Sequence, residues 1–144
     1  MGENYSFTVN GVMRSTSEDK PLLRYLREDL HLHSVKDGCS EGACGTCTIV
    51  VDGKAVKSCI LTTKRAVGKN IITTEGLSDA EKEAFVYAFG AMGSVQCGFC
   101  TPGMVMAGKA LIDRVPDPTE EEIKFALKGN ICRLSLIHIS EPTR

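Results

Sequence analysis

The stretch of sequence that decides the fold runs from Gly38 to Cys59 and reads GCSEGACGTCTIVVDGKAVKSC. Its first half is rich in glycine and has no apolar periodicity, which predicts a loop. Its second half predicts a hairpin around Asp52-Gly53. Four cysteines lie in this stretch, separated by four, two and eleven residues: Cys39, Cys44, Cys47 and Cys59. The sequence therefore brings four thiols to one tight loop and to the end of the hairpin that follows it.

The spacing of these cysteines predicts a [2Fe-2S] cluster. The first three follow the Cys-x4-Cys-x2-Cys pattern of plant-type clusters, whose fourth thiolate comes from further along the chain. Four thiolates must converge on two irons, and the cluster sulfurs need backbone N–H donors. Gly38, Gly42 and Gly45 supply the backbone freedom for such a tightly wrapped loop. A tetrahedral zinc site or a set of buried thiols is the alternative, but zinc knuckles explain neither the four-residue interval nor the glycines.

The residues on either side of this loop predict a small sheet with one helix. Asn10-Gly11, between alternating apolar positions, predicts an N-terminal hairpin. Residues 21–30 predict a helix that starts at a proline and carries four leucines on one face. Residues 70–77 predict a last short strand and an exit turn.

The second half of the chain has helical patterns. Two capping boxes, Ser78 to Glu81 and Thr119 to Glu122, predict helix starts. A further helix is expected to begin near Pro102, and the last one to end at Gly129. The boundary between the two halves is expected near residues 75–78.

The other three cysteines lie in this helical half. Cys97 and Cys100 stand in QCGFCTPG between two predicted helices, and Cys132 stands in GNICR after the last one. A Cys-x2-Cys pair alone fits a redox dithiol, half a zinc site or half a cluster site. The lack of a predicted strand before the pair, and the presence of Cys132, oppose the redox dithiol.

The bulk composition argues against several other classes of protein. The 144 residues include 17 basic and 18 acidic ones, and the formal net charge is -1. This balance gives no reason to expect binding to nucleic acid or to a membrane surface, and no apolar run approaches the length of a membrane span. We expect a cytoplasmic protein, because the start has no secretory pattern and an odd number of cysteines favours metal ligation over disulfides.

Three motifs together resemble one known family. The stretch from Gly38 to Cys59, QCGFCTPGM and GNICR are similar to the cluster motifs of the small iron–sulfur subunit, or N-terminal region, of the molybdenum hydroxylases. This family includes xanthine dehydrogenase, aldehyde oxidoreductase and carbon monoxide dehydrogenase, and the resemblance covers nearly all of residues 4–133. It implies an α+β fold, with a β-grasp plant-type ferredoxin domain over residues 1–76. A helical-bundle [2Fe-2S] domain, with its last helix missing, is expected over residues 77–133.

The resemblance also implies a function. The chain is expected to be the electron-transfer subunit of an oxidoreductase, with no catalytic residues of its own. It would relay electrons from a molybdopterin centre to a flavin or another acceptor through two [2Fe-2S] clusters. The expected partners are a molybdopterin-binding large subunit and an FAD-binding subunit.

Ligands follow from the same resemblance, position by position. The first cluster takes Cys39, Cys44, Cys47 and Cys59, and the second takes Cys97, Cys100 and Cys132. Gln96 matches the glutamine that contacts the pterin in such enzymes, whereas the residues alone would make it a surface amide near a helix end.

The end of the chain departs from the family pattern. The third family motif reads Cys-Arg-Cys, but this chain reads Cys132-Arg133-Leu134, so the second cluster lacks one ligand. Ser135 or His138 could replace it, since histidine ligates iron in Rieske centres, or the domain is naturally degenerate. A third interpretation, which we favour, is that residues 134–144 (LSLIHISEPTR) are an artefact, because they match the translation of a common transposon-based sequencing-library adapter. The natural gene is then expected to continue with a cysteine and a final helix.

Two other functions fit parts of the sequence. A free-standing ferredoxin needs only the first half, but a mobile carrier has no need of an internal relay to a second cluster. A zinc-binding interaction module is the other alternative. Colour distinguishes it, because zinc proteins are colourless and [2Fe-2S] proteins are red-brown.

Overall fold

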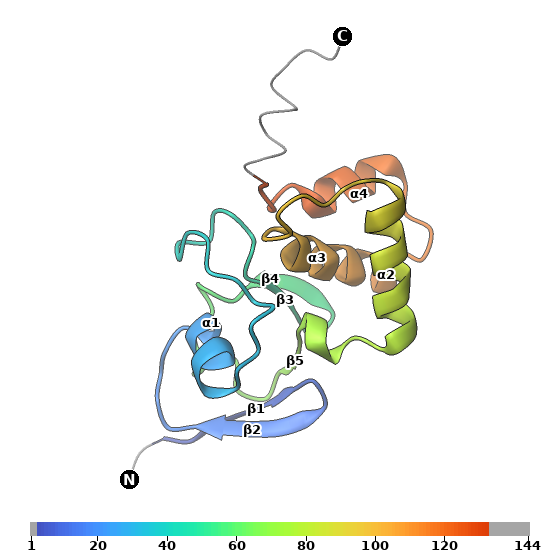
Figure 1. Ribbon diagram of the computed structural model, residues 1–144. Helices are drawn as coiled ribbons and strands as arrows, with labels where there is room; N and C mark the ends of the chain where they lie inside the picture. The colour runs from blue at the N-terminus through green and yellow to red at the C-terminus, as the bar shows by residue number, and fades with distance from the viewer. Residues whose placement is uncertain (1–2, 133–144) are drawn as a thin grey trace.

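A computed structural model of the chain describes residues 3–132 and shows a five-stranded mixed sheet beside a helical half (Figure 1). The sheet has the strand order β2-β1-β5-β3-β4, in which β1 and β5 are parallel and the other neighbours antiparallel. Its strands are β1 Tyr5–Val9, β2 Val12–Thr16, β3 Thr48–Val51, β4 Lys54–Lys57 and β5 Asn70–Ile72. The expected α+β class, with a ferredoxin-like sheet half followed by a helical half, is confirmed.

Both predicted hairpins are present. Asn10 and Gly11 join β1 to β2 with φ angles of 50° and 82°, and Asp52 and Gly53 join β3 to β4 with the same pair of values. Two successive positive φ angles define the turn type whose twist matches that of the flanking strands. The second hairpin sets Thr48 opposite Lys57, so it returns the chain to the start of β3.

The helix predicted over residues 21–30 has the expected place but a different form. It begins as one α-helical turn, α1 Leu22–Arg24, and continues as a π-helical turn, η1 Tyr25–Asp29. Tyr25 and its neighbour Leu26 are both buried in this wider turn. The Tyr25 ring meets Phe7 of β1 edge-on, with the ring centroids 5.3 Å apart. The helix is thereby fixed across one face of the sheet.

The larger of two apolar cores lies between this helix and the sheet. Its buried members come from the strands, the helix and the intervening loops: Phe7, Val9, Leu22, Leu23, Tyr25, Leu26, Val35, Cys47, Ile49, Val51, Ala66 and Ile71. One cysteine of the predicted cluster loop, Cys47, is thus part of the core, at 2% exposure.

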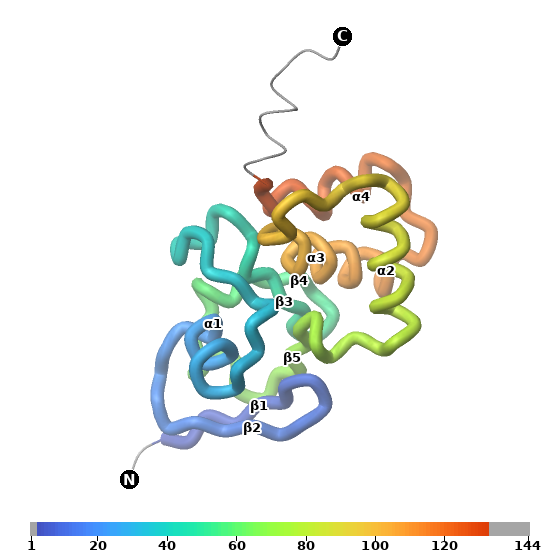
Figure 2. The backbone as a smooth tube through the Cα atoms, in the orientation of Figure 1, coloured from blue at the N-terminus to red at the C-terminus, as the bar shows by residue number. Residues whose placement is uncertain are grey.

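The helical half begins with a 3-10 turn, η2 Thr74–Gly76, and continues with α2 Asp79–Ala91, α3 Thr101–Arg114 and α4 Glu120–Leu127. Both predicted capping boxes are present at the starts of α2 and α4. Figures 1 and 2 show α3 lying next to β3 and β4, with α2 and α4 further out. A second, smaller core joins α3 to the sheet, formed by Val50, Leu77, Val105, Met106 and Ala110.

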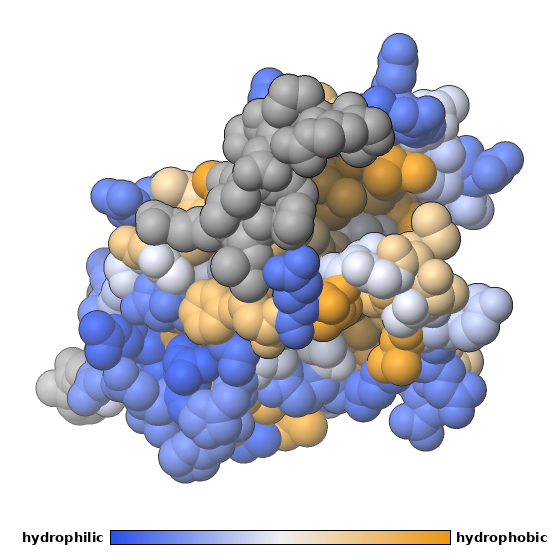
Figure 3. Space-filling model, turned by 45° about the horizontal axis from the view of Figure 1, so that its top comes forward, coloured by the Kyte–Doolittle hydropathy of each residue, from blue (hydrophilic) through white to orange (hydrophobic). Residues whose placement is uncertain are grey.

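Helix α2 is packed more loosely than α3. None of its residues is buried, and Phe85 and Phe89 contact the second core while only partly covered. Val86 and Tyr87 are 73% and 77% exposed. Apolar side chains are visible on the surface of the molecule (Figure 3). A hollow of about 430 Å³ lies between α2 and α3. No helix in the described residues is long and apolar enough to cross a bilayer.

Candidate functional site: two sets of cysteines

The first set of cysteines is positioned by the β3–β4 hairpin and the loop before it. Cys47 directly precedes β3, and Cys59 follows the end of β4 by two residues. Ser58 fixes the two strand ends together, because its N–H and its hydroxyl both donate to the Cys47 carbonyl, at 3.3 and 2.8 Å. Cys39 and Cys44 lie in the loop between η1 and β3.

Backbone N–H groups of this loop point at the cysteine sulfurs. Cys39 Sγ accepts from the N–H groups of Glu41, Ala43 and Cys44 at 3.5, 3.3 and 3.3 Å, and Cys59 Sγ accepts from the N–H of Gly42 at 3.2 Å. These bonds, chiefly the one from Cys44, lower the pKa of the Cys39 thiol to about 7. The loop therefore stabilises a thiolate at Cys39.

Cys59 has the opposite electrostatic environment. Burial raises the pKa of its thiol to about 11, and its hydrogen bond with Cys47 adds to the increase. The hydrogen bond shows that the Cys47 and Cys59 sulfurs are close enough to contribute to one centre, and a bound metal would displace the proton of the Cys59 thiol.

A glycine allows the loop to close on itself at Cys44. A Cβ atom on Gly38 would lie 2.9 Å from both Cys44 Sγ and Thr46 Oγ1, closer than such atoms approach. Cys44 Sγ and Thr46 Oγ1 are themselves 3.1 Å apart, and the Thr46 hydroxyl donates to the Lys36 carbonyl at 3.2 Å. The side chain of Cys44 is therefore held in one place by the surrounding loop.

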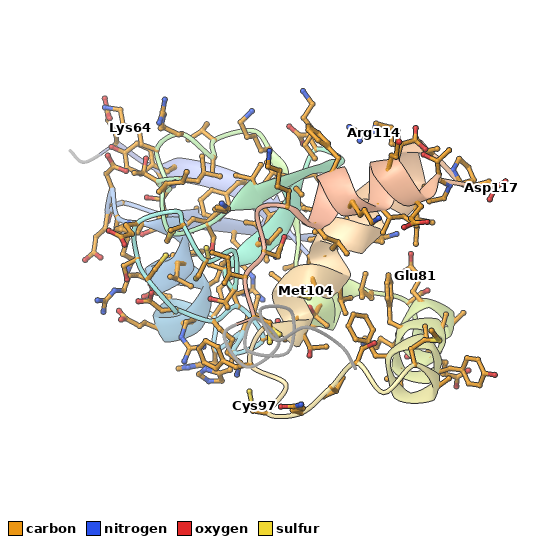
Figure 4. The ribbon with its side chains drawn as sticks, turned by 90° about the horizontal axis from the view of Figure 1, so that it is seen from above. Lys64, Glu81, Cys97, Met104, Arg114 and Asp117 are labelled. Atoms are coloured by element: carbon orange, nitrogen blue, oxygen red, sulfur yellow. The ribbon has the colours of Figure 1, made fainter. Side chains whose placement is uncertain are left out.

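The second set of cysteines lies at the start of α3 and after α4. Cys97 is exposed on the loop between α2 and α3 (Figure 4), Cys100 is the N-cap residue of α3, and Cys132 follows α4. Burial raises the pKa of the Cys100 thiol to about 11, and its hydrogen bond with Cys132 and the nearby Cys97 contribute further. The fold thus brings together three cysteines from two distant segments. No disulfide links any of the seven cysteines.

Members of both sets open onto the same cavity. It has a volume of about 600 Å³, and the cysteines on its wall are Cys39, Cys44, Cys97, Cys100 and Cys132. Phe99 and Ile131 complete the apolar part of the wall. Cys47 and Cys59 stand behind the loop, in and beside the sheet core.

Direct contacts join the two halves next to this cavity. The N–H of Ile131 donates to the carbonyl of Cys44 at 2.8 Å, which links the residue before Cys132 to a residue of the first set. The Asn130 side-chain amide donates to the carbonyl of Gly45 at 3.0 Å. Space at this junction is tight, because a Cβ on Gly45 would lie 2.4 Å from the Gly129 carbonyl.

The arrangement of the first set fits a thiolate-ligated cluster. Four cysteines stand on one loop and one hairpin end, and backbone N–H groups point at two of their sulfurs. Among residues 3–132, no three His, Cys, Asp or Glu side chains converge as they would on one metal ion. A [2Fe-2S] cluster spreads its four thiolates over two irons, so its ligands need not converge on one point.

The sequence also singled out Gln96 and three residues near the end of the chain. Gln96 is exposed and directly precedes Cys97 in the α2–α3 loop. Leu134, Ser135 and His138, on which the interpretation of the missing ligand depends, lie outside the described residues.

Two polar residues of the site were not found from the sequence. Asn130 joins the two halves, and Lys57 donates from its ammonium group to the Gly42 carbonyl at 2.7 Å. Asn130 stands in the quoted GNICR motif, but a helix-end asparagine gives no sign of a partner 85 residues away. Lys57 had no sequence signal, because a lysine in a short strand is ordinarily solvated.

Comparisons with known proteins agree with this geometry. Residues 7–77 match the family described as "2Fe-2S iron-sulfur cluster binding domain", and residues 73–136 match the family described as "[2Fe-2S] binding domain". The chain is 47% identical over 131 residues to the nicotinate dehydrogenase small FeS subunit of Eubacterium barkeri, a match that covers 89% of this chain and 83% of that protein.

Two further matches extend the comparison to another enzyme and to a solved structure. The chain is 46% identical over 131 residues to the xanthine dehydrogenase iron-sulfur-binding subunit of Escherichia coli O157:H7, covering 88% of this chain and 82% of that protein. It superposes on a chain of quinoline 2-oxidoreductase from Pseudomonas putida 86 with a TM-score of 0.82 and 37% identity. That match covers 91% of this chain and 83% of the other.

Proposed function

This chain belongs to the family of small [2Fe-2S] subunits of the molybdenum hydroxylases, and on that premise we propose which of its residues carry electrons. The function of the chain is electron transfer, as part of an oxidoreductase. We propose that the first cluster is held by Cys39, Cys44, Cys47 and Cys59. The second would be held by Cys97, Cys100 and Cys132, with one further ligand.

The observation that carries this proposal is the shared cavity between the two sets of cysteines. A [2Fe-2S] cluster, when bound, supplies a centre that accepts and releases one electron. Around that centre the loop residues of the first set hold sulfurs in place and donate N–H groups to them. Phe99 and Ile131 line the cavity between the two sets, and the hydrogen bond from the Ile131 N–H to the Cys44 carbonyl joins the two halves beside it.

The partner is proposed to dock beside the second set. Cys97 is exposed, and Phe99 next to it is 46% exposed although it is aromatic. Gln96 and Met104 lie on the same loop and first turn of α3. We propose that these residues face a molybdopterin-binding large subunit, with Gln96 toward the pterin. An FAD-binding subunit is proposed to accept the electrons on the side of the first set.

Two further assignments follow. We propose that residues 1–76 and 77–133 are separate domains, since two different family models match residues 7–77 and residues 73–136. Residues 134–144 would belong to neither. We also propose a cytoplasmic location, because seven cysteines without a disulfide suit a reducing compartment.

Affinity purification from the natural host tests the proposal. The tagged chain with its natural C-terminus should bring down a much larger, molybdenum-containing protein. A Phe99→Glu variant should lose that partner, whereas Phe125→Glu, the same change at a 76% exposed site on α4, should keep it. A tagged chain that elutes as a monomer, with no molybdenum in any fraction, would instead support a free-standing ferredoxin.

A further inference from the structure

Lys57 occupies an unusual position for a lysine. It is the last residue of β4, two residues before Cys59, and it is partly buried. Its ammonium group donates to the carbonyl of Gly42, inside the loop of the first set, at 2.7 Å. The turn after α4 covers it from the other side, because a Cβ on Gly129 would lie 3.4 Å from Lys57 Nζ.

The peptide group that Lys57 contacts also faces a sulfur. The Gly42 carbonyl and the Ala43 N–H belong to the same peptide group, and the Ala43 N–H donates to Cys39 Sγ at 3.3 Å. A cation at the carbonyl oxygen draws electron density toward that oxygen, which makes the N–H of the same peptide a stronger donor. Lys57 therefore acts on Cys39 through a chain of two hydrogen bonds and one peptide group.

Lys57 forms no ion pair within the part of the chain that the structure describes. Among the described residues, the ion pairs involve other lysines and arginines, and no carboxylate lies within 4.0 Å of Lys57 Nζ. A partly buried charge is screened less by solvent than an exposed one. Its field consequently reaches the loop sulfurs.

We propose that Lys57 raises the reduction potential of the first cluster. Reduction adds one negative charge to the cluster, and both the ammonium charge and the strengthened Ala43 donor stabilise that added charge. The inference rests on the proposed ligation by Cys39, Cys44, Cys47 and Cys59. It makes Lys57 a positioning and tuning residue, because it acts on the ligands through the Gly42–Ala43 peptide.

Redox titration of the full chain after anaerobic loading with iron and sulfide tests the proposal. The signal of the first cluster is identified as the one lost in Cys44→Ala. Lys57→Met and Lys57→Gln remove the charge, and Lys57→Gln retains a side-chain donor for the Gly42 carbonyl. Lys57→Arg retains the charge. Lys54→Met removes the same charge from an exposed position at the other end of β4, about 10 Å away along the strand.

The midpoint potential of the first cluster should shift to more negative values in Lys57→Met and Lys57→Gln, and should stay near wild type in Lys57→Arg and Lys54→Met. A potential in Lys57→Gln equal to that of the wild type overturns the proposal, and this variant decides the matter if Lys57→Met fails to assemble a cluster. A shift in Lys54→Met as large as that in Lys57→Gln overturns it too, since the effect would not be local. The proposed ligation fails separately, if the wild-type chain holds no iron or if Cys44→Ala keeps every signal.

Discussion

The two sets of cysteines use the same ligand chemistry but are held by different parts of the fold. The first set lies on one continuous loop and hairpin, with Cys47 at 2% exposure in the sheet core and N–H donors at Cys39 and Cys59. The second set joins segments 32 residues apart, from Cys100 to Cys132, and its outermost member Cys97 is exposed. A site on one hairpin forms when that hairpin forms, whereas the second site also needs its helices to be correctly packed.

The helical half adds to this difference. The second core has five buried residues, one of which is Val50 of β3, against twelve in the core of the sheet half, and α2 contributes none of them. The second set therefore depends on the junction with the sheet half, where Asn130, Ile131 and Gly45 meet. Disturbing that junction should affect the second set more than the first.

The largest effect is expected from removing a buried ligand of the first set. Cys47→Ala should abolish the visible and paramagnetic signals of the first cluster, because no neighbouring residue can supply the missing thiolate. Iron analysis and electron paramagnetic resonance after anaerobic reconstitution measure this. Cys97→Ala is the matched control and should leave the first signal intact. If Cys47→Ala retained it, the ligand assignment of the first set would be wrong.

The next largest effect is expected at the junction. Gly45→Ala combines a positive φ of 78° with a contact of 2.4 Å to the Gly129 carbonyl. Gly53→Ala has a similar φ of 82° but open space around it, so it isolates the backbone cost of about 1–2 kcal/mol. Gly45→Ala should lower the free energy of unfolding by about a further 1–3 kcal/mol, as overpacking does.

Urea unfolding of the two glycine variants measures this difference. Equal decreases in the free energy of unfolding of Gly45→Ala and Gly53→Ala would show that the junction accommodates the added methyl group without destabilising the protein. In that case the close packing of the cluster loop against the turn after α4 would not stabilise the protein.

A smaller loss is expected from the polar contact at the same junction. Asn130→Ala removes hydrogen bonds to the Gly45 carbonyl and the Thr48 hydroxyl, at 3.0 and 3.3 Å. The Gly45 carbonyl keeps its bond from the Thr48 hydroxyl, so the free energy of unfolding should fall by only about 0.5–1.5 kcal/mol. Asn70→Ala, at an exposed position in β5, is the control and should change it less. An unchanged unfolding curve for Asn130→Ala would show that the hydrogen bonds of this side chain do not stabilise the junction.

The smallest effect concerns the attachment of α2 to α3. Glu81 pairs with Lys109, which together with the Ser78 N–H lowers the pKa of the Glu81 carboxyl to about 2. A carboxyl with a lowered folded-state pKa stabilises the protein above its unfolded-state pKa and loses that contribution as the pH falls through its folded-state pKa. Because the pair is partly exposed, Glu81→Gln should cost less than about 1 kcal/mol at neutral pH.

The difference between wild type and Glu81→Gln should shrink as the pH falls from the ordinary glutamate range toward about 2. Urea unfolding of the metal-free chains at several pH values measures it. A difference that stays constant over this range would mean that the carboxylate charge is not what joins the two helices.

Much of the fold could be predicted from local sequence features. The Asn-Gly and Asp-Gly turns and both capping boxes depend on residues close together in the chain, and these elements are present. The π-helical turn at Tyr25–Asp29 was not predicted, and it places the Tyr25 ring against Phe7 of β1, a contact between residues far apart in the chain. Propensity gives no information about such tertiary contacts.

The cysteines of the site could be found from their spacing, but their surroundings could not. Lys57 reaches Gly42 and Asn130 reaches Gly45 only because the hairpin and the helical half meet at the cluster loop. The shared cavity likewise depends on how α3 and α4 pack on the sheet. These contacts join residues far apart in sequence, so no local pattern reports them.

The most direct test of the difference between the two sets is the iron content of the 144-residue chain after anaerobic reconstitution. A complete first set and a second set with three cysteines predict about two irons per chain and one paramagnetic signal on reduction. A chain that restores a cysteine at position 134 and a natural C-terminus should hold about four irons and show two signals. If the 144-residue chain already holds about four irons in two stable clusters, the contrast between a complete and an incomplete set is contradicted. Stoichiometric zinc with no iron would contradict the cluster assignment altogether.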